Sequence, residues 1–297
     1  MTTTSKENNN SLSRGKIILF TMACIAIFVI IALVCDMLTS WITVRVVKVV
    51  IREVFLRMPI TIFSLHLFAK KAIKAYDPTA IYGKLTTVNM AKWILIGFAL
   101  PIGIWMFYYF FHFAIPFQHT VDSLSVADKI NLLIIWLAVS IAAGITEEVM
   151  FRGHLYKIIN SKYSKIQSML ITSFLFGLVH IAMLTSFTLA DILIVVFGGI
   201  IAGMMFSFIY QSTKVIWYGA IVHVIWDIFF IGKITTLASS QTDADKAILA
   251  FKLTTQSLLL SGGNFGIEAS APCLVTYLVV SVILYKRFYN YGNKISL

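Results

Sequence analysis

The chain has 297 residues, of which 59% are hydrophobic and only 12% are charged. A soluble domain carries about 25% charged residues, so this composition excludes an ordinary soluble enzyme and predicts a protein that lies in a lipid bilayer. The formal net charge is +11, but the basic residues gather at the ends of apolar runs. We therefore expect them to set membrane topology and to meet lipid headgroups, and we expect no nucleic-acid partner.

Taken in chain order, the apolar segments predict a polytopic helix bundle. Residues 1–15 are polar and rich in Thr, Asn and Ser, so we expect a disordered N-terminal tail there. A spanning helix needs about 20 mostly apolar residues. Strong runs of this kind lie at residues 17–34, 93–113, 131–151, 167–184, 190–210, 215–231 and 272–288, and a weaker run at 41–68 is interrupted by charged side chains. We predict an all-α fold in which residues 16–297 form a single transmembrane domain of about eight spanning helices.

The connections between these segments predict the topology. Lys and Arg collect in alternate connections, and cytoplasmic loops carry the excess of such residues. This alternation predicts a multi-pass protein of the cell membrane with both termini in the cytoplasm and the loop at 232–271 outside. In that loop we expect an amphipathic helix near 243–260, followed by a turn at 262–264. Gly199 and Gly203, four residues apart, predict a close helix–helix contact.

Two adjacent acids are the first candidates for function, because charged side chains inside a membrane are costly. Glu147 and Glu148 follow a run of small and apolar residues. On a helix, Glu148 shares a face with Arg152 and can pair with it, whereas Glu147 is rotated about 100° away. The pattern therefore predicts a supporting ion pair for Glu148 and Arg152, and a working base in Glu147. An ordinary charged helix end would explain the same residues without chemistry.

Two histidines on later apolar segments are the next candidates. His180 ends the run FGLVH, and a lone histidine of this kind is more often a packing residue than a catalyst. His223 and Asp227 are four residues apart, so they share a helix face and can hydrogen-bond. A purely structural pair would have the same spacing.

The positions of these acids and histidines along their helices strengthen the case for a shared site. If the segments at 131–151 and 167–184 form a hairpin that turns near residues 160–165, Glu147 and His180 both lie roughly 25 Å from the turn. His223 falls near the middle of its own segment. One Glu and two His can therefore converge at one buried point. Amide hydrolysis needs such a base for water and donors where negative charge develops.

The order EExxxR, FxxxH and HxxxD, with each motif on its own transmembrane segment, resembles the CAAX prenyl endopeptidase and bacteriocin-processing family. The resemblance covers residues 131–231, which we expect to be the catalytic core. It implies an intramembrane peptidase in which Glu147 and His180 activate a water. His223 and Asp227 would stabilise the oxyanion, with Glu148 and Arg152 in support of the site.

Asp227 departs from the Asn that the prenyl endopeptidases carry at this position. An ionised Asp accepts hydrogen bonds and cannot donate one to an oxyanion. We therefore expect Asp227 to orient His223, which then donates alone.

The cofactor and the biological role stay open at this stage. Glu147, His180 and His223 would make a His₂Glu zinc set, although the sequence has no HExxH motif; the other mechanism depends on glutamate without a metal. We expect the lipid bilayer and a peptide or membrane-tethered protein as partners, in processing of signalling or bacteriocin peptides or in self-immunity. The rivals are a catalytically silent scaffold that regulates a partner protein, and a transporter with a Glu/His proton relay.

Overall fold

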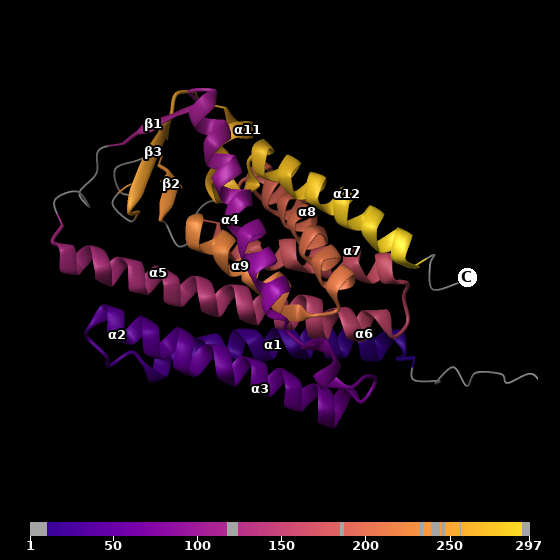
Figure 1. Ribbon diagram of the computed structural model, residues 1–297. Helices are drawn as coiled ribbons and strands as arrows, with labels where there is room; N and C mark the ends of the chain where they lie inside the picture. The colour runs from indigo at the N-terminus through magenta and orange to yellow at the C-terminus, as the bar shows by residue number, and fades with distance from the viewer. Residues whose placement is uncertain are drawn as a thin grey trace, which may run out of the picture.

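The computed structural model describes residues 11–117, 124–184, 187–231, 234–238, 244, 247–255 and 257–292. Helices make up most of this part of the chain, as the sequence predicts (Figure 1). By length and composition, five helical runs among the described residues could cross a membrane: Arg14–Leu38, Thr87–Phe110, Val126–Asn160, Lys165–Met183 and Leu189–Thr213. Two shorter apolar helices, Ile216–Phe229 and Ala271–Lys286, coincide with the remaining strong segments.

The N-terminal layer contains the first and the weakest of the predicted segments. Helix α1 (Arg14–Leu38) begins inside the stretch expected to be a tail, because the Ser13 side chain caps it by accepting from the Lys16 N–H; residues 1–10 lie outside the described residues. The weak segment is one helical run made of α2 (Arg45–Val50), η1 (Ile51–Arg57), α3 (Met58–Phe68) and η2 (Ala69–Ile73).

The charges that interrupt the weak segment pair with one another and with α1. Arg52 Nη1 lies 2.6 Å from Asp36 Oδ1, and Arg57 Nη1 lies 2.8 Å from Glu53 Oε2. A charge in an apolar setting is tolerated when it is paired. The interrupting residues therefore hold α1 against this run instead of preventing a helix.

The central helix of the fold runs between the N-terminal layer and the remaining helices (Figure 1). It consists of α5 (Val126–Glu147), the wider π-helical turn η5 (Glu148–Leu155) and α6 (Tyr156–Asn160). Helix α7 (Lys165–His180) starts after a turn of four residues, 161–164. Ser164 and Gln167 form a capping box there, which satisfies the first N–H groups of α7. This confirms the predicted hairpin.

Small residues bring the helices of the second layer together. This layer contains α4 (Thr87–Phe110), α7, α8 (Leu189–Thr213), α9 (Ile216–Phe229) and α12 (Ala271–Gly292). A Cβ placed on Gly199 would lie 2.4 Å from Gly177 Cα, and one on Gly203 would lie 2.7 Å from Ser173 Cβ. The close contact predicted from Gly199 and Gly203 is therefore confirmed, and it joins α8 to α7. A Cβ on Gly144 would lie 2.8 Å from the Val224 nitrogen, so α5 and α9 are equally close.

A small sheet at one end of the bundle corrects one expectation. Strand β3 (Leu249–Leu253) pairs antiparallel with β1 (Ala114–Pro116) and parallel with β2 (Thr235–Leu237). The prediction of an amphipathic helix near 243–260 is therefore wrong over 249–253. The described residues of this stretch are helical at 244 and in the short α11 (Leu258–Ser261), whereas residues 243, 245–246 and 256 lie outside the described part. Backbone pairing with distant strands, which no local pattern reports, overrides the helical periodicity.

The expected turn at 262–264 is present. Gly262 and Gly263 have φ angles of +72° and +66°, in the left-handed region that glycine adopts without strain. The turn leads through η7 (Gly263–Phe265) and η8 (Ile267–Ala269) into α12.

Candidate active site

Glu147 and Glu148 lie where the central helix changes from α to π geometry. Glu147 is the last residue of α5, and Glu148 is the first residue of η5. A π-helical turn inside an α-helix is uncommon and often marks a functional site. Glu147 keeps 17% of its side chain exposed, whereas Glu148 keeps 0%. The two neighbouring acids therefore have different environments, as the sequence predicts.

Glu148 forms the predicted pair with Arg152. Arg152 Nη1 lies 2.9 Å from Glu148 Oε1. The guanidinium carbon also lies 4.3 Å from the centre of the Phe176 ring and 5.1 Å from that of Phe206. A cation held between two aromatic faces and a carboxylate is compensated electrostatically although it is buried.

Glu148 has a second partner that sequence reasoning missed. Its Oε1 lies 3.0 Å from His223 Nδ1, so this acid holds one imidazole of the site as well as Arg152. A Cβ on Gly219 would lie 2.9 Å from Glu148 Oε2. A glycine at 219 therefore leaves the room that this carboxylate occupies against α9.

The hydrogen bond of His180 determines which of its nitrogens faces the other site residues. His180 Nδ1 lies 2.7 Å from the Phe176 carbonyl oxygen. A carbonyl oxygen only accepts, so Nδ1 carries a proton and donates it. Nε2 is then directed toward Glu147, with 3.9 Å between His180 Nε2 and Glu147 Oε2.

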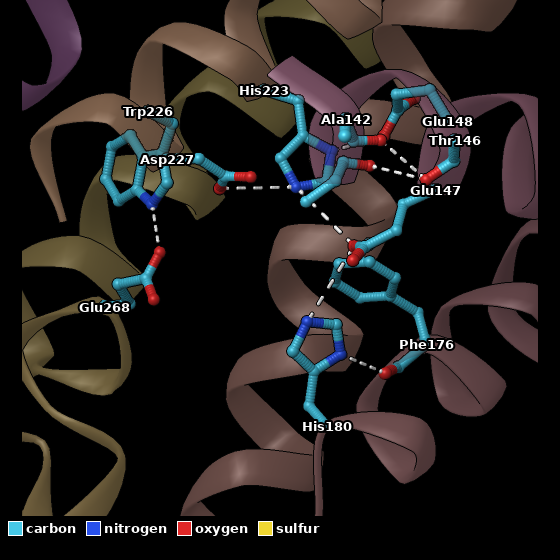
Figure 2. A network of polar contacts seen from close by, with 12 residues as sticks. Ala142, Thr146, Glu147, Glu148, Phe176, His180, His223, Trp226, Asp227 and Glu268 are labelled. Atoms are coloured by element: carbon cyan, nitrogen blue, oxygen red, sulfur yellow. Dashed lines mark hydrogen bonds and ion pairs between the residues drawn. The ribbon is translucent and has the colours of Figure 1, made fainter. Parts of the chain in front are cut away.

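His223 is oriented in the same way from the opposite side. Its Nδ1 contacts Glu148, and its Nε2 lies 3.8 Å from Glu147 Oε2 and 3.6 Å from Asp227 Oδ1. The Phe206 ring stacks on the imidazole at 4.5 Å between centres. Figure 2 shows the Glu147 carboxylate between the rings of His180 and His223, with Asp227 on the far side of His223. The four candidate residues, from α5, α7 and α9, are thus brought together.

A small cavity lies beside the two imidazoles. The distances from Glu147 Oε2 to the two Nε2 atoms exceed a hydrogen bond. His180, His223 and Asp227 line a cavity of ≈ 40 Å³. A buried water needs about 10–15 Å³ and two or more polar partners, so the cavity can hold water within reach of both imidazoles.

Glu268 is a further acid in this cavity that sequence reasoning did not select. It lies in η8, outside the spanning helices, and its Oε1 accepts a hydrogen bond of 2.8 Å from Trp226 Nε1 (Figure 2). Burial raises the pKa of the Glu268 carboxyl to about 7, against the lowering effect of the indole hydrogen bond. An isolated acid just before the last apolar segment was the available signal, but a loop acid has no periodic pattern that assigns it to a site.

The fit of a metal ion can be tested on the donor set. Both imidazoles direct Nε2 toward Glu147 while Nδ1 is held by an acceptor, which is the support that metal-binding histidines usually have. However, no group of three His, Cys, Asp or Glu side chains among the described residues is arranged to hold a metal ion. The side chains as placed therefore do not form a zinc site.

Comparison with known proteins agrees with the motif order. A family model described as type II CAAX prenyl endopeptidase, Rce1-like, matches residues 129–229. This region therefore carries a domain of that family, and the match spans α5 to α9 with all six motif residues. No curated protein and no solved structure matches the chain.

Proposed function

Because residues 129–229 carry a domain of the CAAX endopeptidase family, we propose that this protein is an intramembrane endopeptidase that hydrolyses a peptide bond with water activated by Glu147 and His180. One observation carries the proposal. Glu147 Oε2 lies 3.8–3.9 Å from the Nε2 atoms of two histidines, and both histidines line a cavity of a size that holds water. Three helices that are distant in the sequence supply these groups.

Glu147 is the general base of the proposed reaction. It takes a proton from the water as the water oxygen bonds to the carbonyl carbon of the substrate. The tetrahedral intermediate then collapses, the C–N bond breaks, and the Glu147 carboxylic acid returns the proton to the departing amine nitrogen. His180 orients the water through Nε2, because its Nδ1 proton is committed to the Phe176 carbonyl oxygen.

His223 is the donor that stabilises the oxyanion. The Glu148 carboxylate accepts the Nδ1 proton, so Nε2 can donate only when the ring carries both protons. The neighbouring carboxylates of Glu147 and Asp227 stabilise this charged form, whose Nε2–H faces the cavity. Asp227 Oδ1 lies 3.6 Å from this Nε2 and cannot donate when ionised, so it acts as a positioning residue. Arg152 keeps the Glu148 carboxylate compensated in its apolar setting.

The substrate of the proposed reaction is a peptide or a membrane-tethered protein end. An active site within the bundle favours a substrate that already lies at the membrane. Processing of a signalling or bacteriocin peptide, or self-immunity to one, is the role we propose, in a multi-pass cell-membrane protein with both termini cytoplasmic. The alternative is a membrane scaffold that regulates a partner protein without catalysis.

Cleavage of membrane-tethered peptides by the purified full-length protein tests the proposal. Glu147→Gln keeps the shape of the side chain but cannot take a proton, and we expect turnover to fall about 10²–10⁴-fold. Asp77→Asn, which alters an exposed carboxylate before α4, is the matched control and should retain turnover. Near-normal cleavage by Glu147→Gln would exclude the mechanism. A Glu147 variant that loses cleavage but keeps the cellular phenotype of the wild type would favour the scaffold.

Metal content, measured on the same folded samples, distinguishes a metal-dependent mechanism from a glutamate-dependent mechanism without metal. With a metal, substitution of Glu147, His180 or His223 should each lower bound zinc, and a chelator should abolish wild-type cleavage. Without one, the wild type should cleave with less than stoichiometric metal. The second result is the one we expect.

A further inference from the structure

A second polar cavity lies at the end of the bundle where α4 and α9 begin and α8 ends. Its volume is ≈ 230 Å³, several times that of the cavity beside His180 and His223. Lys84 and Lys92 line it together with Asn89, Ser212, Thr213 and Tyr218. None of these residues belongs to the six motif positions, and the proposed peptidase does not use the cavity.

The charge of this cavity selects an anion. Two lysines are among its lining residues, and no Asp or Glu is among the described residues that line it. An ammonium group has three hydrogen-bond donors and no acceptor. Helices α4 and α9 both begin at this cavity without a side-chain cap on their N-termini, and a helix N-terminus adds partial positive charge.

The hydrogen bonds of the lining residues show which donors remain for a ligand. Ser212 Oγ and Thr213 Oγ1 both donate to the Ile209 carbonyl, so their protons are committed. Tyr218 Oη accepts a 3.0 Å hydrogen bond from the Thr86 N–H. Its oxygen also lies 3.4 Å from Thr86 Oγ1, where either hydroxyl can donate. The two ammonium groups are therefore the main donors for a ligand, and Tyr218 lines the cavity beside them.

The aromatic side chains around the cavity indicate where the anion comes from. Trp93 stacks on Tyr218 at 6.3 Å between centres, Tyr82 stacks on Trp217 at 5.7 Å, and Lys92 Nζ lies 5.8 Å from the Trp93 ring. Trp and Tyr gather at the headgroup level of membrane proteins, and Lys near a helix end reaches for the same layer. The cavity therefore has the residue types of the headgroup layer, in which lipid phosphates are the abundant anions.

We infer that this cavity binds the phosphate of an anionic phospholipid headgroup, held by Lys84, Lys92 and Tyr218 at the junction of α4, α8 and α9. Helix α9 carries Tyr218 at one end and His223 and Asp227 further along. A lipid bound at this junction would tie the start of that helix to α4. Lipid binding at this junction does not require peptidase activity.

Native mass spectrometry of the full-length protein in detergent tests the inference, with phosphatidylglycerol and phosphatidylcholine of the same acyl chains as probes. We expect one phosphatidylglycerol to bind more tightly than phosphatidylcholine. The double substitution Lys84→Gln with Lys92→Gln should weaken that binding by roughly tenfold or more. Both lysines are exposed, so the variant should fold, and its thermal unfolding without lipid checks this directly.

Lys70→Gln with Lys71→Gln is the matched control, because these lysines are exposed in η2 and do not line the cavity. It should change phosphatidylglycerol binding less than twofold. Equal weakening by the two double variants, or equal binding of the two lipids, would overturn the inference. Inorganic phosphate forms the last arm: displacement of the lipid by millimolar phosphate would make this a free-anion site and overturn the lipid assignment.

Discussion

Glu148 Oε1 lies 3.0 Å from His223 Nδ1 and 2.9 Å from Arg152 Nη1, so one buried carboxylate joins the central helix to α9. The contact with His223 links the stability of the fold to the orientation of a proposed oxyanion donor. Glu148 is therefore expected to affect folding and chemistry together, and a variant at this position must be examined for both.

Glu148→Gln should lower both folded yield and turnover per folded molecule. Breaking a buried ion pair by removal of one charge costs about 3–5 kcal/mol, and the amide also changes the partner of His223. Glu53→Gln is the matched control, because Glu53 is a buried acid paired with Arg57 and lies apart from the site. It should lower yield but leave turnover per folded molecule intact. Equal turnover in the two variants, measured on monodisperse protein, would limit Glu148 to a structural role.

Glu147→Gln and His180→Ala should not be additive. Both groups are proposed to act on one water, and residues that act as a unit lose most of the rate with the first substitution. We expect each single variant to lose about 10²–10⁴-fold in kcat/KM and the double variant to lose little more. A double variant whose loss is the product of the two single losses would show that the residues act on separate steps.

Glu268 should make stability fall as pH rises. Burial raises the pKa of its carboxyl in the folded protein to about 7 from 4.5, so the folded state holds the proton more tightly than the unfolded state in this window. The free energy of unfolding therefore decreases as the pH rises from about 5 to 8. Glu268→Gln cannot ionise and keeps an acceptor for Trp226. The thermal midpoint of Glu268→Gln should therefore rise relative to that of the wild type as the pH increases over this range. Midpoints that change in parallel with pH in the two proteins would contradict the prediction.

Gly199→Ala should destabilise the bundle. The added Cβ would lie 2.4 Å from Gly177 Cα, so α7 and α8 must separate, and overpacking typically costs about 1–3 kcal/mol. Gly103→Ala in α4 is the control, because nothing lies within 4 Å of its added Cβ. That substitution should be neutral or slightly stabilising, since Ala is the better helix former. Thermal unfolding in one detergent compares the two, and equal midpoints would refute the packing argument.

The sequence by itself determined the membrane class, most of the helices and the residues of the candidate site. Long apolar runs have one stable form in a bilayer, because a helix satisfies its own backbone hydrogen bonds. Charged side chains within such runs are costly and therefore stand out as candidates. Their similar depths on one predicted hairpin place Glu147 near His180. The Glu148–Arg152 pair followed from spacing along one helix, which is a local property.

Only the tertiary structure decided the contacts between elements that are distant along the chain. Three features depend on how whole helices pack. They are the hydrogen bond between Glu148 and His223, the position of Glu268 in the cavity of the candidate site, and the cavity at Lys84 and Lys92. The strand at 249–253 has the same origin, since its backbone partners lie at Ala114–Pro116 and Thr235–Leu237. Periodicity reports which face of a segment is apolar, but it carries no information about which other segment will cover that face.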